Sequence, residues 1–245
     1  MIRNIKLTIQ YDGTHYAGWQ FQKNAKTIQE VISETIENVT GRKVNLIGSG
    51  RTDSGVHANA QVANFKTRST IPLKNLQMAL NSNLPKDIVI TRVEEADIRF
   101  NARRDAGSKL YRYTIFNGNF VDPFLRRYAA KCFYKLDLNA MRLASKALLR
   151  RHDFRSFQAK DTRERSSVRT IKNIKIEKKG KLVYIHIEAD GFLYNMARNI
   201  AGTLIEIGRG KMSHENVKQI LRKRDRRFSG PTAPSRGLCL MKVRY

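Results

Sequence analysis

Two runs of predicted elements follow one another along this chain in the same order, and this repetition limits the folds that it can adopt. Apolar residues alternate or recur at helical spacing, so each run reads strand, helix, strand, strand, helix, strand. The first run is predicted at residues 2–11, 27–39, 44–47, 61–65, 73–80 and 88–93. The second is predicted at 109–116, 138–151, 170–178, 182–189, 192–207 and 238–244, with an added helix at 215–223 that Ser213 would cap.

This order is that of the ferredoxin-like fold, in which helices cover one face of an antiparallel sheet. The chain is therefore predicted to be an α+β protein made of two fused ferredoxin-like halves, residues 1–104 and 105–245. No low-complexity linker separates the halves, which favours one fused unit. We expect an active-site cleft between them.

The charge of the chain predicts a polyanionic partner. Lys and Arg number 47 against 21 Asp and Glu, a formal net charge of +26. Nucleic acid is the most common partner of such a surplus, and a membrane-surface protein or a merely soluble basic protein is the alternative. Residues 1–104 carry 15 cations and 9 acids, whereas residues 105–245 carry 32 and 12. The second half is therefore expected to hold more of the phosphate contacts, with 160–169 and 222–227 as candidates or as solvated surface.

Other features indicate an intracellular protein without a metal site. The two cysteines, Cys132 and Cys239, lie far apart and form no C-x-x-C motif, so reduced thiols are expected. The first residues lack the apolar stretch of a signal peptide, and no apolar run approaches the length of a membrane span. The five histidines show no metal-binding spacing. We expect a cytoplasmic protein that binds no metal.

A glycine-rich segment, GSGRTDSGVHA from Gly48 to Ala58, carries the strongest chemical signal. It begins like a dinucleotide-binding loop but has Asp53 where the third glycine would stand, and it lacks the Lys-Ser of a P-loop. A tight turn in which Asp53 binds local N–H groups is one interpretation. It leaves the neighbouring Arg51 unexplained. A phosphate-rich partner repels a carboxylate, so Asp53 is not expected to be merely a solvated surface residue. This favours a chemical role for Asp53.

Two further residues have both a structural and a functional interpretation. Arg198 points away from the apolar stripe of its predicted helix, so it is either solvated or directed at a site between the halves, where it would keep Asp53 ionised. Tyr111 belongs to a strand with alternating aromatics, which fits either the core or stacking on an unpaired base. A cluster of glycines, aromatics and polar residues at 11–20 indicates a functional loop or a turn.

These motifs, in this order and at these spacings, closely resemble the tRNA pseudouridine synthase A family. The matching segments are YDGT at 11–14, GWQ at 18–20, GRTDSGVHA at 50–58, LNSNLP at 80–85, FNAR at 100–103, KLYRY at 109–113, HDF at 152–154, VRTI at 168–171, GFLYNMAR at 191–198, PTAP at 231–234 and GL at 237–238. One small departure is Ala197, where the family often has valine.

The resemblance implies a pseudouridine synthase fold and a homodimer that acts on tRNA without a cofactor. The reaction would convert uridine to pseudouridine at positions 38, 39 and 40, in the anticodon stem-loop. Asp53 would be the nucleophile, Arg198 its partner, and Tyr111 a residue that packs on the base and later acts as a general base. The resemblance also implies substrate-binding residues, which are Arg51, Thr52, Gly55, His57 and Gln20. A non-catalytic RNA-binding protein built from paired sheets is the alternative.

Overall fold

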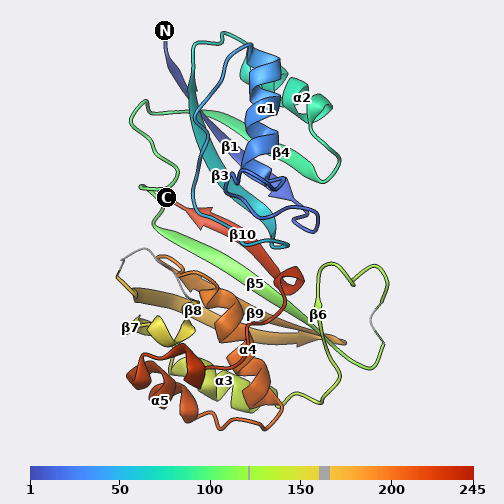
Figure 1. Ribbon diagram of the computed structural model, residues 1–245, viewed down its shortest axis with the longest axis vertical. Helices are drawn as coiled ribbons and strands as arrows, with labels where there is room; N and C mark the ends of the chain where they lie inside the picture. The colour runs from blue at the N-terminus through green and yellow to red at the C-terminus, as the bar shows by residue number, and fades with distance from the viewer. Residues whose placement is uncertain (121, 160–165) are drawn as a thin grey trace. The chain divides into compact units, whose positions relative to one another are not determined.

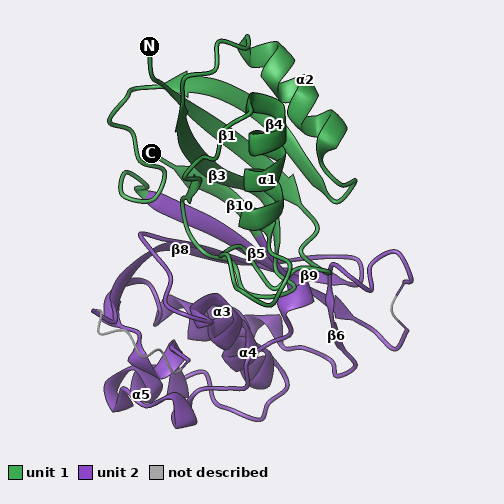
Figure 2. Ribbon diagram, turned by 45° about the horizontal axis from the view of Figure 1, so that its top comes forward, with its two compact units in different colours: residues 1–107, 240–245 green, residues 108–239 purple. Residues whose placement is uncertain are grey.

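The computed structural model describes residues 1–120, 122–159 and 166–245 and divides the chain into two compact units (Figure 2). Unit 1 comprises residues 1–107 and 240–245, and unit 2 comprises residues 108–239. The C-terminal strand β10 (Leu238–Arg244) therefore begins in unit 2 and ends in unit 1. In both units the sheets are mostly antiparallel, and the predicted α+β class is confirmed.

Unit 1 has the predicted order of elements. They are β1 (Arg3–Tyr11), α1 (Ile28–Thr40), β2 (Ile47–Gly48), β3 (His57–Thr67), α2 (Leu73–Asn83) and β4 (Ile88–Ala96). The sheet runs β4-β1-β3-β10, with β2 also paired to β3. Ile5 lies opposite Phe65 on β3, and Ile5, Leu7 and Ile9 are fully buried. Both helices lie on the same side of this sheet (Figure 1).

Helix α1 shows how local sequence sets the elements of unit 1. Thr27 and Glu30 form a capping box, in which each side chain accepts a hydrogen bond from the other residue's backbone N–H. Gly41 ends the helix at a φ of 70°, a backbone conformation that glycine adopts without strain. Ile28, Ile32 and Ile36 are buried along one face, so the capped helix packs an apolar stripe onto the sheet.

Unit 2 repeats the pattern with extra elements. They are β5 (Ser108–Asn117), β6 (Ala130–Cys132), α3 (Leu138–Lys146), β7 (Arg150–Asp153), η1 (Arg155–Phe157), β8 (Val168–Lys179), β9 (Leu182–Ala189), α4 (Met196–Gly208), α5 (Asn216–Lys223), η2 (Arg226–Phe228) and η3 (Ser235–Gly237). The sheet runs β5-β9-β8-β7, and β6 pairs with β5 in parallel. Helices α3 and α4 pack closely at Gly208, where there is no room for a side chain. A Cβ at this position would lie 2.7 Å from the sulfur of Met141.

Several predicted boundaries are wrong, each for a local reason. The helix predicted at 138–151 ends at Lys146, since Arg150 has a φ of 78° and opens strand β7. The helix predicted at 192–207 begins only at Met196, because Asn195 is left-handed, with a φ of 59°. The strand predicted at 44–47 shrinks to two residues, and the backbone carbonyl of Leu46 accepts a hydrogen bond from a helix side chain instead.

Other expectations concern the cap of α5, the thiols and the membrane. Helix α5 (Asn216–Lys223) begins after Glu215, which makes no side-chain cap, and the Ser213 hydroxyl accepts a 3.3 Å hydrogen bond from the Glu215 N–H in the turn just before the helix. Cys132 and Cys239 are not joined in a disulfide, and burial raises the pKa of the Cys132 thiol. No helix among residues 1–120, 122–159 and 166–245 combines the length and apolarity that crossing a membrane requires.

Candidate active site

Asp53 lies in the loop between β2 and β3, and β3 holds the beginning of that loop. The Ser49 hydroxyl donates a 2.6 Å hydrogen bond to the side-chain oxygen of Gln61, and the Gln61 amide donates to the carbonyl of Gly50 at 3.0 Å. Ser49 and Gln61 are both fully buried. The Asp53 side chain is half-buried, so the loop presents a carboxylate from a fixed backbone.

A second loop, residues 12–20, braces the Asp53 loop from the other side. The backbone N–H of Trp19 donates to the carbonyl of Thr52 at 3.0 Å. The carbonyl of Tyr16 accepts from the Gly55 N–H at 3.3 Å and from the Ser54 hydroxyl at 3.2 Å. The residues on both sides of Asp53 are therefore tied to the 12–20 loop.

Glycines allow the two loops to approach so closely. Gly18 has a φ of 95°, and a Cβ there would lie 2.4 Å from the carbonyl oxygen of Thr52. A Cβ at Gly13 would lie 2.0 Å from the carbonyl oxygen of Val56. Both distances are far below any real contact, so side chains at these positions would separate the loops. The glycines of the 11–20 cluster are therefore required to position the Asp53 loop.

Thr52 and His57, both predicted to bind substrate, are buried beneath this loop. The Thr52 hydroxyl lies 2.7 Å from the hydroxyl of Tyr11, and either group can donate. Nδ1 of His57 lies 3.1 Å from the backbone nitrogen of Gly13 and 3.1 Å from the Asp12 carboxylate. Both side chains connect the Asp53 loop to residues 11–13.

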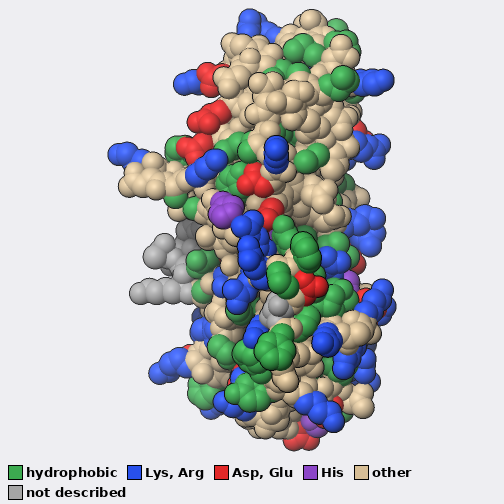
Figure 3. Space-filling view, turned by 90° about the vertical axis from the view of Figure 1, so that its right-hand side faces the viewer, with side chains coloured by type: hydrophobic (Ala, Val, Ile, Leu, Met, Phe, Trp, Pro, Cys, Tyr) green, Lys and Arg blue, Asp and Glu red, His purple; other side chains and the backbone are tan. Residues whose placement is uncertain are grey.

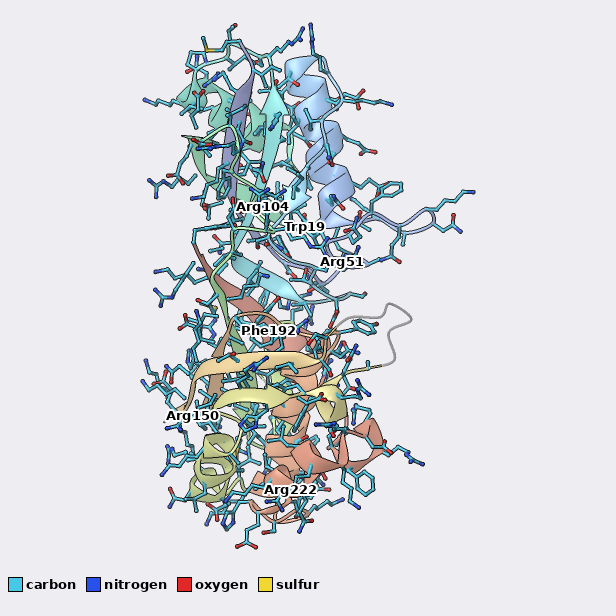
Figure 4. All side chains as sticks on the ribbon, turned by 90° about the vertical axis from the view of Figure 1, so that its left-hand side faces the viewer. Trp19, Arg51, Arg104, Arg150, Phe192 and Arg222 are labelled. Atoms are coloured by element: carbon cyan, nitrogen blue, oxygen red, sulfur yellow. The ribbon has the colours of Figure 1, made fainter. Side chains whose placement is uncertain are left out.

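A chain of side-chain hydrogen bonds orients Arg51. Its Nε donates to the Gln20 side-chain oxygen at 3.1 Å, and the Gln20 amide donates to Gln29 at 2.8 Å. Gln29 in turn donates to the carbonyl of Leu46 at 2.9 Å. An open hollow of about 170 Å³ lies here, and Trp19, Gln20, Arg51 and Arg103 are among its lining residues. Figure 4 labels Trp19 and Arg51, which come from the two interlocked loops.

Arg198 lies in the first turn of α4, and its guanidinium is anchored within unit 2. Nε donates to the carbonyl of Ala233 at 2.8 Å, and Nη1 donates to the side-chain oxygen of Asn195 at 3.0 Å. The Pro231–Ala233 backbone reaches Arg198 because Gly202 leaves room: a Cβ there would lie 1.8 Å from the carbonyl oxygen of Pro231. Arg198 is therefore a fixed cation, and the interpretation as a solvated side chain is wrong.

Tyr111 is buried in β5. Its ring meets that of Phe192 edge to face, with the centroids 4.8 Å apart and the planes at 80°. Phe192 lies in the segment just before α4 and holds the ring of Tyr111 from one side. Asp53 belongs to unit 1, whereas Arg198 and Tyr111 belong to unit 2, so their assembly into one site stays a prediction.

The predicted phosphate contacts of unit 2 divide into exposed and internal residues. Arg222, Lys223 and Arg224 are exposed on and just after α5. Arg226 is half-buried and donates to the side-chain oxygens of Asn199, at 3.1 Å, and of Thr232, at 3.0 Å. Burial lowers the pKa of Arg226, and its internal bonds make the prediction of a phosphate contact wrong for this residue. Residues 160–165, also predicted to contact phosphate, lie outside the described residues.

Sequence reasoning missed the support that Arg226 and Asn199 give to α4. Asn199 is fully buried, donates to the carbonyl of Phe157 at 2.7 Å and accepts from Arg226 and Thr232. An asparagine on the apolar side of a helix is the signal that could have found it. Elsewhere, Lys and Arg side chains are spread over both units on the face shown in Figure 3. Among the residues that the structure describes, no three His, Cys, Asp or Glu side chains are grouped to hold a metal.

Comparison with known proteins places this geometry in a family. The family model described as tRNA pseudouridine synthase matches residues 7–104 and 144–245, and the chain belongs to this family. It is 47% identical over 244 residues to the tRNA pseudouridine synthase A of Thermoanaerobacter sp. (strain X514), with 100% of both chains covered. It is 50% identical over 244 residues to the tRNA pseudouridine synthase A 2 of Clostridium perfringens (strain 13 / Type A), again with 100% of both covered.

The chain is also similar to a solved structure described as a Cbf5-Nop10-Gar1 complex, with a TM-score of 0.40 and 10% identity, over 96% of this chain and 57% of that chain. The predicted resemblance is confirmed by the family match. The protein is therefore an enzyme that isomerises uridine to pseudouridine in tRNA. The alternative of a non-catalytic RNA-binding protein is set aside.

Proposed function

We propose that the enzyme acts on uridines 38, 39 and 40 of the tRNA anticodon stem-loop, with Asp53 as its nucleophile. One observation carries the assignment of Asp53. In a chain of net charge +26, this half-buried carboxylate sits in a loop held by β3 and by the 12–20 loop. A carboxylate repels the phosphates of an RNA substrate, so Asp53 is poorly suited to binding that substrate. A carboxylate held in a fixed position is instead suited to take part in the reaction.

The chemistry requires an ionised carboxylate and nothing that is consumed. The bond between C1′ and N1 of the uridine breaks, the uracil turns, a bond forms between C1′ and C5, and the proton on C5 is lost while N1 gains one. Asp53 would attack C1′ of the sugar or C6 of the base, or remove a proton from C2′. In each case the carboxylate is regenerated, and the target base must first leave its stack.

Charged and aromatic neighbours have proposed roles around this step. Arg51 is two residues from Asp53 and is oriented by Gln20, which suits it to hold the flipped-out nucleotide. Arg198 has a guanidinium anchored by Ala233 and Asn195, which suits it to pair with Asp53 in a cleft between the two halves. Tyr111 would pack on the base and serve as the later general base.

The other predicted substrate-binding residues have different support. Gly55, with a φ of 74°, allows the turn that follows Asp53. Thr52 and His57 are buried, so we propose that they act by holding the loop rather than by touching the nucleotide.

A homodimer and a cytoplasmic location belong to the same proposal. Phe120 and Phe124 are each 86% exposed, and Tyr128, Phe133 and Tyr134 of the same segment are also exposed. Aromatic side chains exposed in this way favour a contact with another protein surface, here a second copy.

The test is isomerisation of tRNA labelled with tritium at C5 of uracil, followed by mapping of pseudouridine. Wild type is expected to release tritium from positions 38, 39 and 40. Asp53→Asn should release none and bind tRNA at least as tightly as wild type, because a phosphate-repelling charge is gone. Turnover of Asp53→Asn within tenfold of wild type would overturn the nucleophile assignment, and product at other positions would overturn the proposed specificity.

A further inference from the structure

Three hollows lie on unit 1, and each shares lining residues with the next. The first is the hollow of about 170 Å³ beside Arg51, and the second, of about 420 Å³, lies between residues 43–47, β3 and residues 98–104. The third, of about 250 Å³, lies among residues 42–44 and 66–68. The first and second share Asn45 and Ile47 as lining residues, and the second and third share 43, 44 and 66.

Cations line all three hollows, and no carboxylate does. We call these eight residues the basic trail: Arg51, Arg103, Arg104, Arg99, Lys43, Lys66, Arg42 and Arg68. They are eight of the fifteen cations in residues 1–104, whereas none of the nine acids of that stretch lines a hollow. Surface charges that only keep a protein soluble are normally mixed in sign. The absence of acidic residues from these three hollows therefore indicates a binding role for the cations.

Half of the basic trail forms no ion pair with the residues that the structure describes. Arg99 and Arg104 pair with the adjacent Asp97 and Asp105, at 3.4 and 2.8 Å. The residues at the far end of the trail form no ion pair within the described part of the chain. These residues are Arg42, Lys43, Lys66 and Arg68. Like charges gathered in neighbouring hollows repel each other, and a polyanion relieves that repulsion.

We infer that the basic trail holds the phosphate backbone of the substrate RNA beyond the nucleotide that reacts. The trail begins at Arg51, two residues from Asp53, and reaches Arg68 at the end of β3. Figure 4 shows Arg51, Trp19 and Arg104 following one another on unit 1. This inference rests on the proposed function, because it takes the RNA as the substrate of the Asp53 site. It also gives unit 1 a binding role, although the sequence places the larger charge surplus in the second half.

The far end of the trail gives the sharpest test, because its residues are exposed and none of them lies in the Asp53 loop. The triple variant Lys43→Gln, Lys66→Gln and Arg68→Gln removes three cations. The control variant Lys74→Gln, Lys86→Gln and Arg92→Gln removes three exposed cations of the same unit that line none of these three hollows, one of which, Arg92, pairs with Glu94 at 2.9 Å. Binding of unmodified tRNA is measured between 0.05 and 0.2 M salt, and single-turnover tritium release is measured with tRNA saturating.

The trail variant should lower the slope of log affinity against log salt by about 2 to 3 and weaken binding about 100-fold at 0.1 M salt. Its single-turnover rate at saturation should stay within twofold of wild type. The control should change the slope by less than 1. Equal slopes in the two variants would overturn the inference.

Light scattering on the same samples separates RNA binding from self-association. A trail variant that loses tRNA binding only because its dimer dissociates would overturn the inference. The failure of the proposed function has a different signature: wild type binds tRNA with the expected salt slope and releases no tritium. In that case the slopes of the two variants still decide whether the trail binds RNA.

Discussion

Gly18→Ala tests whether the bracing of the Asp53 loop by the 12–20 loop positions the carboxylate that we propose as the nucleophile. An L side chain at positive φ costs about 1–2 kcal/mol by itself. The added Cβ would also lie 2.4 Å from the Thr52 carbonyl oxygen and 3.0 Å from the carbonyl carbon of Asp53. Both atoms belong to the backbone, so the Asp53 loop must move by at least 0.6 Å to reach even a 3.0 Å contact.

A matched control separates this displacement from backbone strain. Gly41 also has a positive φ, 70°, and a Cβ there would meet nothing within 4 Å. Gly41→Ala should therefore lower the free energy of unfolding by about 1–2 kcal/mol and leave the chemistry unchanged. Gly18→Ala should lower it by about 2–4 kcal/mol, because the clash adds to the strain.

The decisive measurement is the single-turnover rate of tritium release with tRNA saturating. A misplacement near 1 Å costs up to about 100-fold, so Gly18→Ala should be slower than wild type by about 10- to 100-fold, with tRNA affinity within threefold. Urea unfolding of both variants shows that each is folded under the assay conditions. Equal rates for Gly18→Ala and Gly41→Ala would refute the argument that the 12–20 loop positions Asp53.

Two further predictions concern unit 2. Arg198→Lys should keep a small part of the single-turnover rate and Arg198→Ala less, because lysine retains the charge but not the two-pronged geometry that fits a carboxylate; equal rates in wild type and Arg198→Ala would exclude the proposed pairing. The pKa of Asp153 is lowered on folding. Burial alone would raise this pKa, but it is outweighed by the hydrogen bonds from the Ser167 hydroxyl and the Arg155 N–H and by the charges of Arg155 and Arg224. This group therefore stabilises the fold above its unfolded pKa, near 3.9, and the contribution is lost as the pH falls through the lower folded value. Asp153→Asn should accordingly reduce the free energy of unfolding at pH 7 and flatten its decline between about pH 5 and pH 2, and an unchanged decline measured by urea titration would contradict this.

The order of elements was readable from the sequence because it depends on local periodicity. Helix α1 is an example, with its Thr27 cap, its isoleucine stripe and Gly41 at its end. The errors arose where one residue overrides the period: Arg150 and Asn195 both take positive φ, which ends or delays a helix that apolar spacing would extend.

The candidate site was only partly readable, because its support is made by contacts between distant residues. Asp53 stood out by its glycine-rich setting, but no spacing rule indicates that Gly13 lies against Val56 or that Thr52 meets Tyr11. Similarly, a run of cations does not reveal which side chain turns inward, as Arg226 does.

The return of the chain to unit 1 through β10 has a consequence for synthesis on the ribosome. Residues 1–107 emerge first, but their sheet includes β10 beside β3, and the Tyr245 hydroxyl donates to the carbonyl of Ala102 at 2.9 Å. The edge of β3 that β10 covers thus stays open while all of unit 2 is being translated. Domains usually fold in order from the N-terminus as they appear. Here the first unit to emerge is the last to be completed, so the Asp53 loop gains its full scaffold only after translation has passed residue 240.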